Sequence, residues 1–220
     1  FYQNNITENF TGNVTLEPLK DFRIRLSFLR NSTKGIQSIF KYDGTQWMDQ
    51  GLTETGTFSI SGLFLSTHFV KDISQNENHP NPVFDAFLSN RYTVASRLQL
   101  QDPRFNGLEI DSATAFPLGY SKTSQDVILG GFYSAYSGSD VGRSELGIFP
   151  TLPMPNWNID YNGLSKLPFL SDIFNNINIK HAYKGTYTVG NYQRNLRFDE
   201  NEIPESGSDL TPKYQIADVT

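Results

Sequence analysis

Asn176–Tyr192 reads NINIKHAYKGTYTVGNY, and its side chains alternate between an apolar and a polar row. A period of two places the two rows on opposite faces of an extended strand. The run exceeds the roughly 5–6 residues of a typical globular strand, whereas a transmembrane β-strand needs about 9–11. The pattern fits a membrane barrel, and it also fits a β-sandwich. The apolar row is Ile177, Ile179, His181, Tyr183, Gly185, Tyr187 and Val189, and the polar row is Asn178, Lys180, Ala182, Lys184, Thr186 and Thr188.

Asp21–Asn31 repeats this alternation, with four apolar residues on one parity and charged or hydroxyl residues on the other. Val14 and Leu16 alternate in the same way before Pro18, so the two runs predict a β-hairpin with a short connection. The apolar row is Phe22, Ile24, Leu26 and Phe28, and the polar row is Arg23, Arg25 and Ser27.

The whole chain is expected to be mainly β, an antiparallel sheet with short helices in two inserted regions, 71–90 and 102–155. Asn81-Pro82 predicts the start of a helix that runs to Asn90, and Ser124 the cap of a helix that ends near Gly138. Strands are expected near residues 13–17, 21–31, 36–42, 57–69, 91–101, 157–162, 176–192 and 213–220.

Composition narrows the function classes. Charged residues make up 19% and aromatic residues 14% of the 220 residues, against about 25% charged in average soluble domains. Membrane barrels share this bias, and so do soluble β-sandwiches.

The net charge of −5 argues against a nucleic-acid partner, which requires clustered Lys and Arg. No run of about 18 apolar residues occurs, which excludes a transmembrane helix. The opening Phe1-Tyr2-Gln3 is no signal peptide, so the chain is expected to be an interior or processed piece.

No catalytic, cofactor or metal site is predicted. The chain has no cysteine, and its three histidines lie far apart, at His68, His79 and His181. No nucleophile elbow and no phosphate-binding glycine loop occurs, so the chain is not expected to be an enzyme. Four N-x-[ST] triplets are interpreted as chance products of an Asn- and Thr-rich composition; they begin at Asn5, Asn9, Asn13 and Asn31.

Three strings carry a family resemblance: Leu16–Phe22 (LEPLKDF) leading into Arg23–Asn31, Ser124–Val127 with Ala135–Gly138, and Pro155–Lys166 (PNWNIDYNGLSK). With these strings the chain resembles the SprA (Sov) family, giant outer-membrane translocons of the type IX secretion system. The stretch Asn176–Tyr192 also resembles this family. The resemblance covers nearly the whole chain in the same order and is weakest over residues 102–122.

The resemblance implies one segment of a very large transmembrane β-barrel; the largest single-chain barrels have about 36 strands. It implies a location in the outer membrane of a Gram-negative bacterium of the Bacteroidota type. The function implied is passage of folded cargo proteins, together with support of gliding motility. The partners implied are outer-membrane lipid, secreted cargo, a plug protein and a PorV-type shuttle barrel. The inserted helices would lie over the pore mouth or inside the lumen.

In the wall of a membrane barrel, the apolar row of each strand would face lipid and the polar row would face the channel. Two alternatives remain: a cell-surface or secreted β-sandwich that acts as an adhesin or binding module, and a small autonomous barrel of about eight strands. The expected lipid-facing residues are Phe22, Ile24, Leu26, Phe28, Ile177, Ile179 and Tyr187, and the expected lumen-facing residues are Arg23, Arg25, Lys180, Lys184 and Thr186.

Overall fold

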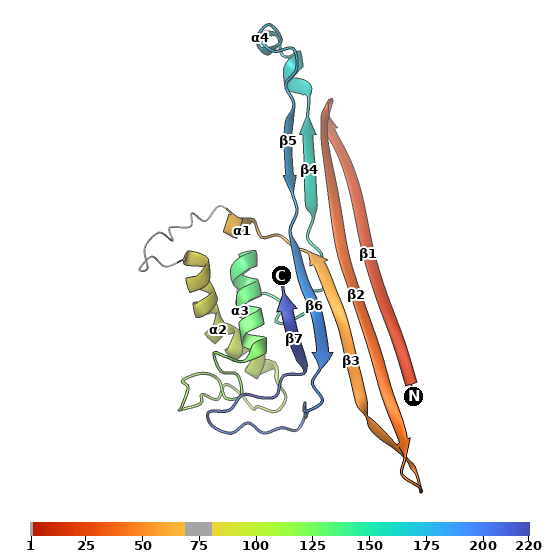
Figure 1. Ribbon diagram of the computed structural model, residues 1–220. Coiled ribbons are helices and arrows are strands. Elements are labelled where there is room, and N and C mark those ends of the chain that lie inside the picture. Colours follow the sequence, from red (N-terminus) through yellow and green to blue (C-terminus); the bar gives the residue numbers. More distant parts are fainter. Residues whose placement is uncertain (1, 69–80) are drawn as a thin grey trace.

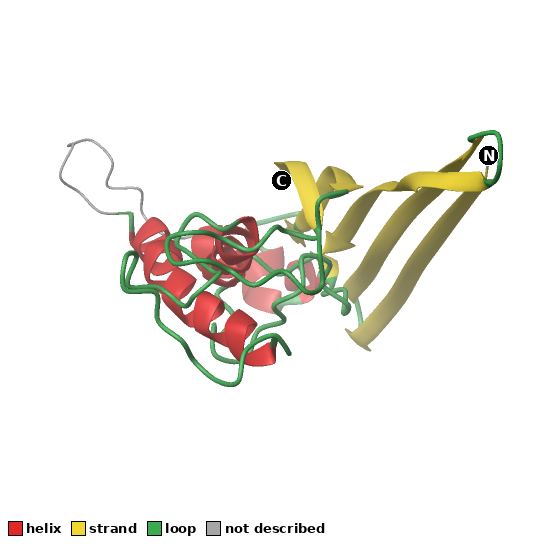
Figure 2. Ribbon diagram, turned by 90° about the horizontal axis from the view of Figure 1, so that it is seen from below, coloured by secondary structure: helices red, strands yellow, loops and turns green. Residues whose placement is uncertain are grey.

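A computed structural model describes residues 2–68 and 81–220. Within them the protein is mainly β: seven strands form one antiparallel sheet, and an inserted helical unit lies against one of its faces (Figures 1 and 2). The sheet is open and is not closed into a barrel by the described residues. The predicted antiparallel, mainly β class is confirmed at this level.

A long hairpin forms one side of the sheet. β1 (Tyr2–Leu19) has 18 residues and β2 (Phe22–Tyr42) has 21, joined through Asp21 at a positive φ of 66°. The predicted strands 13–17, 21–31 and 36–42 are parts of these two continuous strands. The break expected between Asn31 and Ile36 is absent, because residues 32–35 pair with β1 on one side and with β3 on the other. Polar residues are tolerated there because their backbone is fully paired.

Two shorter strands share the other edge of β2. β3 (Trp47–Ser61) pairs with its residues 30–42, and β4 (Asn156–Tyr161) pairs with its residues 22–27, both antiparallel to β2. β3 and β4 therefore run in the same direction, one after the other, as a single interrupted strand. The join is closed by the Ser61 hydroxyl, which donates to the Met154 carbonyl at 2.6 Å, and by the Met154 N–H, which donates to the Ser61 carbonyl at 2.9 Å. Residues 62–155 are thus an insertion between the two parts of this strand.

The stretch Asn176–Tyr192 is also interrupted. β5 (Ile179–Tyr183) pairs with β4, whereas β6 (Thr186–Arg194) pairs with β3 and with β7 (Tyr214–Val219). Gly185 marks the break: its N–H donates to the Asn156 Oδ1 at 2.8 Å, and its carbonyl accepts from the Gly62 N–H at 3.1 Å. A Cβ on Gly185 would collide with the Tyr183 hydroxyl and the Gly62 carbonyl, so glycine is required at this close approach. The connection from β4 to β5 contains the short helices η1 (Gly163–Lys166) and α4 (Pro168–Ser171).

The predicted strand 91–101 is wrong, because this segment is the second half of α2 (Pro82–Gln101). The predicted helix start is correct: Asn81 accepts from the N–H of Val83 at 2.9 Å. In the second half the buried residues are spaced for a helix, whereas Tyr92 and Leu100 are 43% and 60% exposed. The apparent alternation arose because exposed and buried apolar residues both lie at even positions.

The other helices follow the sequence signals more closely. α3 (Gln125–Ser137) begins after Ser124 and ends at Gly138, whose φ of 65° is left-handed, so both predicted ends are confirmed. In the described structure the side chain of Ser124 makes no capping hydrogen bond. The strand expected over 57–69 ends at Ser61, and α1 (Leu65–His68) follows it. Residues 69–80, which include the first half of the inserted region expected at 71–90, lie outside the described residues.

One core joins the sheet to the insertion, and a second lies within the insertion. The first is formed by residues of β3 and β6 with Tyr133 of α3 and Phe149 packed on them. The second lies around Val127 of α3 and Ala95 of α2, closed by Leu210 from the β6–β7 connection. The buried residues of the first core are Phe58, Ile60, Tyr187, Val189 and Tyr192.

Candidate functional site: the two faces of the sheet

Register assigns each strand residue to one of two faces, because directly opposed residues of antiparallel strands share a face. Ile24 lies between Leu16 of β1 and Ile159 of β4, and His181 of β5 continues that row. We call this side the apolar face. The next row starts with Arg25, which lies between Thr15 and Asn158, and we call that side the polar face.

The apolar face carries a band in the half of the sheet built from β4, β5 and the adjoining parts of β1 and β2 (Figure 1). Val14 and Leu16 are 43% and 47% exposed, and no second sheet covers the band within residues 2–68 and 81–220. Exposed apolar patches of this kind mark an interaction with protein or membrane. Members of the band are Val14, Leu16, Phe22, Ile24, Leu26, Phe28, Trp157, Ile159, Tyr161, Ile179, His181 and Tyr183.

Aromatic rings lie at both ends of the band. At one end Phe22 packs edge-to-face on Tyr161, with ring centroids 5.6 Å apart. Toward the other end Trp157 stacks on Tyr183 at 4.6 Å and donates from Nε1 to the Nδ1 of His181 at 3.0 Å. Membrane barrels carry an apolar band about 25 Å tall between two aromatic girdles. The band has this layered composition.

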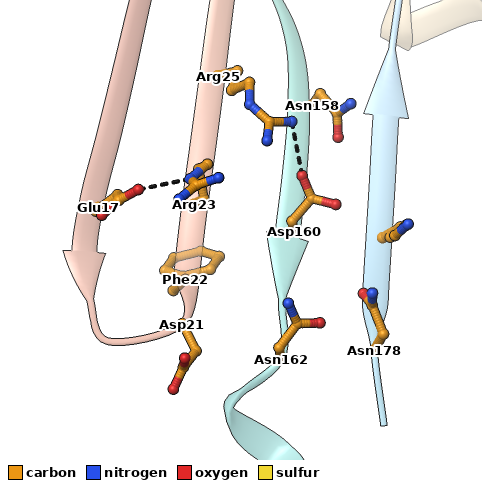
Figure 3. A pocket seen from close by; sticks show the side chains of 10 residues that line it. Glu17, Asp21, Phe22, Arg23, Arg25, Asn158, Asp160, Asn162 and Asn178 are labelled. Carbon is orange, nitrogen blue, oxygen red and sulfur yellow. Dashed lines mark hydrogen bonds and ion pairs between the residues drawn. The ribbon is translucent and has the colours of Figure 1, made fainter. Parts of the chain in front are cut away.

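The polar face opposite the band carries paired charges (Figure 3). Arg23 lies directly across from Asp160, and Asp160 lies across from Lys180. Arg23 pairs with Glu17 at 2.6 Å, and Arg25 pairs with Asp160 at 3.0 Å. Exposed ion pairs of this kind contribute about 0–1 kcal/mol to the free energy of unfolding. This face is therefore a hydrated surface and not part of a hydrophobic core.

Further along, the same face is an uncharged ladder of amide and hydroxyl groups. Thr33 and Thr57 share a hydrogen bond of 2.7 Å between their hydroxyls, and Asn9 lies directly across from Asn31. In β1 Asn and Thr alternate at every second residue from Asn5 to Thr15, so three of the N-x-[ST] triplets lie on one face of a strand. The sequence interpretation missed this ladder, although its period of two was readable. On β1 it comprises Gln3, Asn5, Thr7, Asn9, Thr11, Asn13 and Thr15.

The register separates most of the predicted facing residues into two sets on opposite faces of the sheet, while their contact with lipid or with a lumen stays a prediction. Phe22, Ile24, Leu26, Phe28 and Ile179 lie on the apolar face, and Arg23, Arg25, Lys180 and Thr186 lie on the polar face. Ile177 precedes β5, and Lys184 lies in the gap between β5 and β6.

Tyr187 is a correction to the predicted lipid-facing set. It lies on the apolar face but is only 4% exposed, because Tyr133 of α3 packs on its ring at 5.3 Å between centroids. Its hydroxyl donates to the carbonyl of Ile148 in the insertion at 3.2 Å. Protein therefore covers Tyr187, and this position cannot contact lipid.

A buried carboxylate holds the insertion to the β6–β7 connection. Asp111 is 5% exposed and accepts hydrogen bonds from the Ser206 hydroxyl at 2.6 Å, the Ala113 N–H at 3.0 Å and the Gly207 N–H at 2.9 Å. These bonds, the one from Ser206 foremost, lower the pKa of Asp111 from 3.8 to about 2. The cluster is structural, since its donors all come from loops that it fastens together.

Asp111→Asn is expected to destabilise this loop junction at neutral pH, with an effect that shrinks as the pH falls to about 2. Because the folded-state pKa is lowered, the stabilisation is present above the ordinary pKa and is lost as pH falls from about 4 toward about 2. Thermal melting of both proteins as a function of pH measures the gap in Tm. Asp140→Asn, at a carboxyl group that is 63% exposed, is the control and should show no such gap. A gap as large at pH 2 as at pH 7 would contradict the assignment.

A second cluster in the insertion is likewise structural. Asp102 accepts from Arg104 at 2.7 Å and from the Tyr120 hydroxyl at 2.8 Å. Burial raises the pKa of Asp102, but these hydrogen bonds outweigh it and the net pKa is lowered. Within the described part of the chain, no group of three or more His, Cys, Asp or Glu residues could hold a metal ion. His79 lies outside the described residues.

Comparison of the chain with protein-family models and with curated proteins finds no match. In the described ranges, every helix is too short or too polar to cross a membrane. The assignment to the SprA (Sov) family therefore stays a proposal based on the quoted motifs.

Proposed function

We propose that this chain is a segment of the wall of an outer-membrane β-barrel through which folded proteins are exported, as in the type IX translocons whose motifs it resembles. The carrying observation is a sheet with two opposite surfaces: an exposed apolar band with aromatic ends, and a continuous polar face behind it. The apolar band would contact outer-membrane lipid, and the polar face would line the conduit. In this proposal the function includes support of gliding motility, and a PorV-type barrel and a plug protein are partners.

The polar face suits a passage for folded proteins. Its ladder of Asn, Thr and Ser side chains carries no net charge, so it offers no strong electrostatic attraction to passing cargo. Its charged groups are largely paired, as in Arg23–Glu17 and Arg25–Asp160. A lumen of this kind stays hydrated and does not hold one cargo more tightly than another.

The strand edges support a segment of a larger barrel. Four strands cross the level of the apolar band: β1, β2, β4 and β5. Membrane barrels have at least about eight strands, so the described residues cannot close one on their own. Within these residues β1 pairs only with β2, and β5 only with β4. Because every backbone group must be paired in lipid, further strands have to adjoin both edges.

The β-sandwich alternative fits less well. A sandwich would have strands of about 5–6 residues and a second sheet over the apolar face. β1 and β2 have 18 and 21 residues, and among the described residues no second sheet lies over the band. No specific observation favours an adhesin.

A photo-crosslinking side chain placed in the full-length protein tests the proposal in cells that export cargo. Asn158 and Ile159 are neighbours on β4 whose side chains lie on opposite faces. A photoreactive residue at position 158 is expected to capture secreted cargo, because it would project into the conduit. At position 159 it is expected to capture lipid and no cargo. Cargo adducts of equal yield at both positions, or at position 159 alone, would refute the proposal.

A further inference from the structure

The helical insertion lies on the same face of the sheet as the apolar band. Phe58 of β3 and Tyr187 of β6 are on the apolar face by register, and they contact Phe149 and Tyr133 of the insertion. Figure 2 shows the helices together on one side of the sheet. If that face meets lipid, as the proposed function requires, the insertion lies outside the barrel wall and not within the lumen or over its mouth.

One end of the insertion lies directly below the band. In Figure 1, α1 is level with the gap between β3 and β4, with the first turns of α2 and one end of α3 close by. The N–H of Phe64, just before α1, donates to the Tyr183 hydroxyl at 2.6 Å. Tyr183 in turn stacks on Trp157 in the band. The insertion is therefore continuous with the edge of the band.

This end of the insertion is rich in aromatic rings. Phe64 packs on Tyr133 at 6.4 Å between centroids, and Phe84 packs on Phe87 at 5.7 Å. Phe84 is 50% exposed, and Leu88, one turn further along α2, is 37% exposed. Aromatic side chains are enriched at the level of lipid headgroups, where part of the ring is dry and part is wet.

We propose that this end of the insertion, made of α1 and the first two turns of α2 with the adjoining aromatic side chains, rests in the lipid headgroup layer on the outer surface of the wall. The inference rests on the proposed function. The far end of α2 then projects into water. Leu100 is 60% exposed and lies about 24 Å from Phe84 along the helix axis, at 1.5 Å per residue. The insertion would hold the wall at a fixed depth in the bilayer.

Spin labels on single cysteines test this depth. The sequence has no cysteine of its own, so Phe84→Cys, Leu100→Cys and Ile159→Cys each give one site in full-length protein cleared of any further cysteines and reconstituted in phospholipid vesicles. Collision with oxygen, which is concentrated in lipid, and with a water-soluble nickel chelate reports the depth of each label. Phe84 and Leu100 are matched, because both are exposed apolar residues on α2.

We expect the ratio of oxygen to nickel collisions to be highest at Ile159, intermediate at Phe84 and lowest at Leu100. Equal, low ratios at Phe84 and Leu100, with a high ratio at Ile159, would overturn the headgroup contact and leave the proposed wall intact. Shielding of Phe84 from both reagents would also overturn it, because a protein partner would then cover that end. A low ratio at Ile159 would overturn the proposed function, and the inference with it.

Discussion

Ile24→Arg is expected to reduce the folded full-length protein in the outer membrane by about 30-fold or more, whereas Ser27→Arg is tolerated. Ile24 lies in the middle of the apolar band between Leu16 and Ile159. An Arg on the lipid face near the bilayer midplane costs about 2–4 kcal/mol, and each 1.4 kcal/mol is about tenfold in an equilibrium constant. Ser27 is exposed on the polar face, where water solvates a guanidinium group.

The two changes are matched because they introduce the same side chain on opposite faces of one strand, three residues apart. Assembly is measured as the amount of protease-resistant protein recovered with the outer membrane. If both variants assemble equally well, the band does not face lipid. If Ser27→Arg is the more damaging change, the two faces are assigned the wrong way round.

Phe58→Ala is expected to destabilise the packing of the insertion on the sheet by about 3–5 kcal/mol of free energy, the usual cost of truncating a buried Phe. Phe58 is 2% exposed and packs on Phe149 at 5.3 Å between centroids. The guanidinium of Arg30 lies 5.5 Å from the Phe58 ring and loses that contact as well. The lost packing joins the insertion to β3, so cleavage within residues 138–155 by added protease should rise steeply.

Phe169→Ala is the matched control, because Phe169 is 67% exposed in the β4–β5 connection. Its truncation should leave the cleavage rate of the insertion unchanged. A Phe58→Ala protein cleaved no faster than the control would show that the insertion does not depend on this core for its position. Cleavage follows the equilibrium population of the opened state when reclosing is fast, so the ratio of rates gives the free-energy change.

The alternation in the sequence was enough to place the band. The prediction that Phe22, Ile24 and Leu26 share one face is confirmed, because a period of two determines which side chains lie together whatever the strand pairs with. The start of α2 at Asn81-Pro82 and the end of α3 at Gly138 were also readable, because caps are local signals.

The prediction of secondary structure failed where the apolar spacing fitted both a strand and a helix. The prediction of exposure failed where tertiary packing buries a side chain. Residues 91–101 carry apolar residues at even positions, and only the contacts with α3 and the 109–118 loop show that Val94 and Gln99 are buried on a helix. Tyr187 shares its parity with Ile179, yet a helix distant in the sequence covers one and leaves the other 48% exposed. No local pattern reports such coverage.

The sequence by itself determined that long, two-faced strands form, because alternation is a property of neighbouring residues. Only the tertiary structure decided that residues 62–155 interrupt one strand of the sheet, which stops at Ser61 and resumes at Asn156. It also decided that Asn176–Tyr192 breaks at Gly185 and that the insertion lies on the apolar face. These features depend on pairings between residues far apart in the chain, and the alternation of neighbouring residues does not determine which distant segments pair.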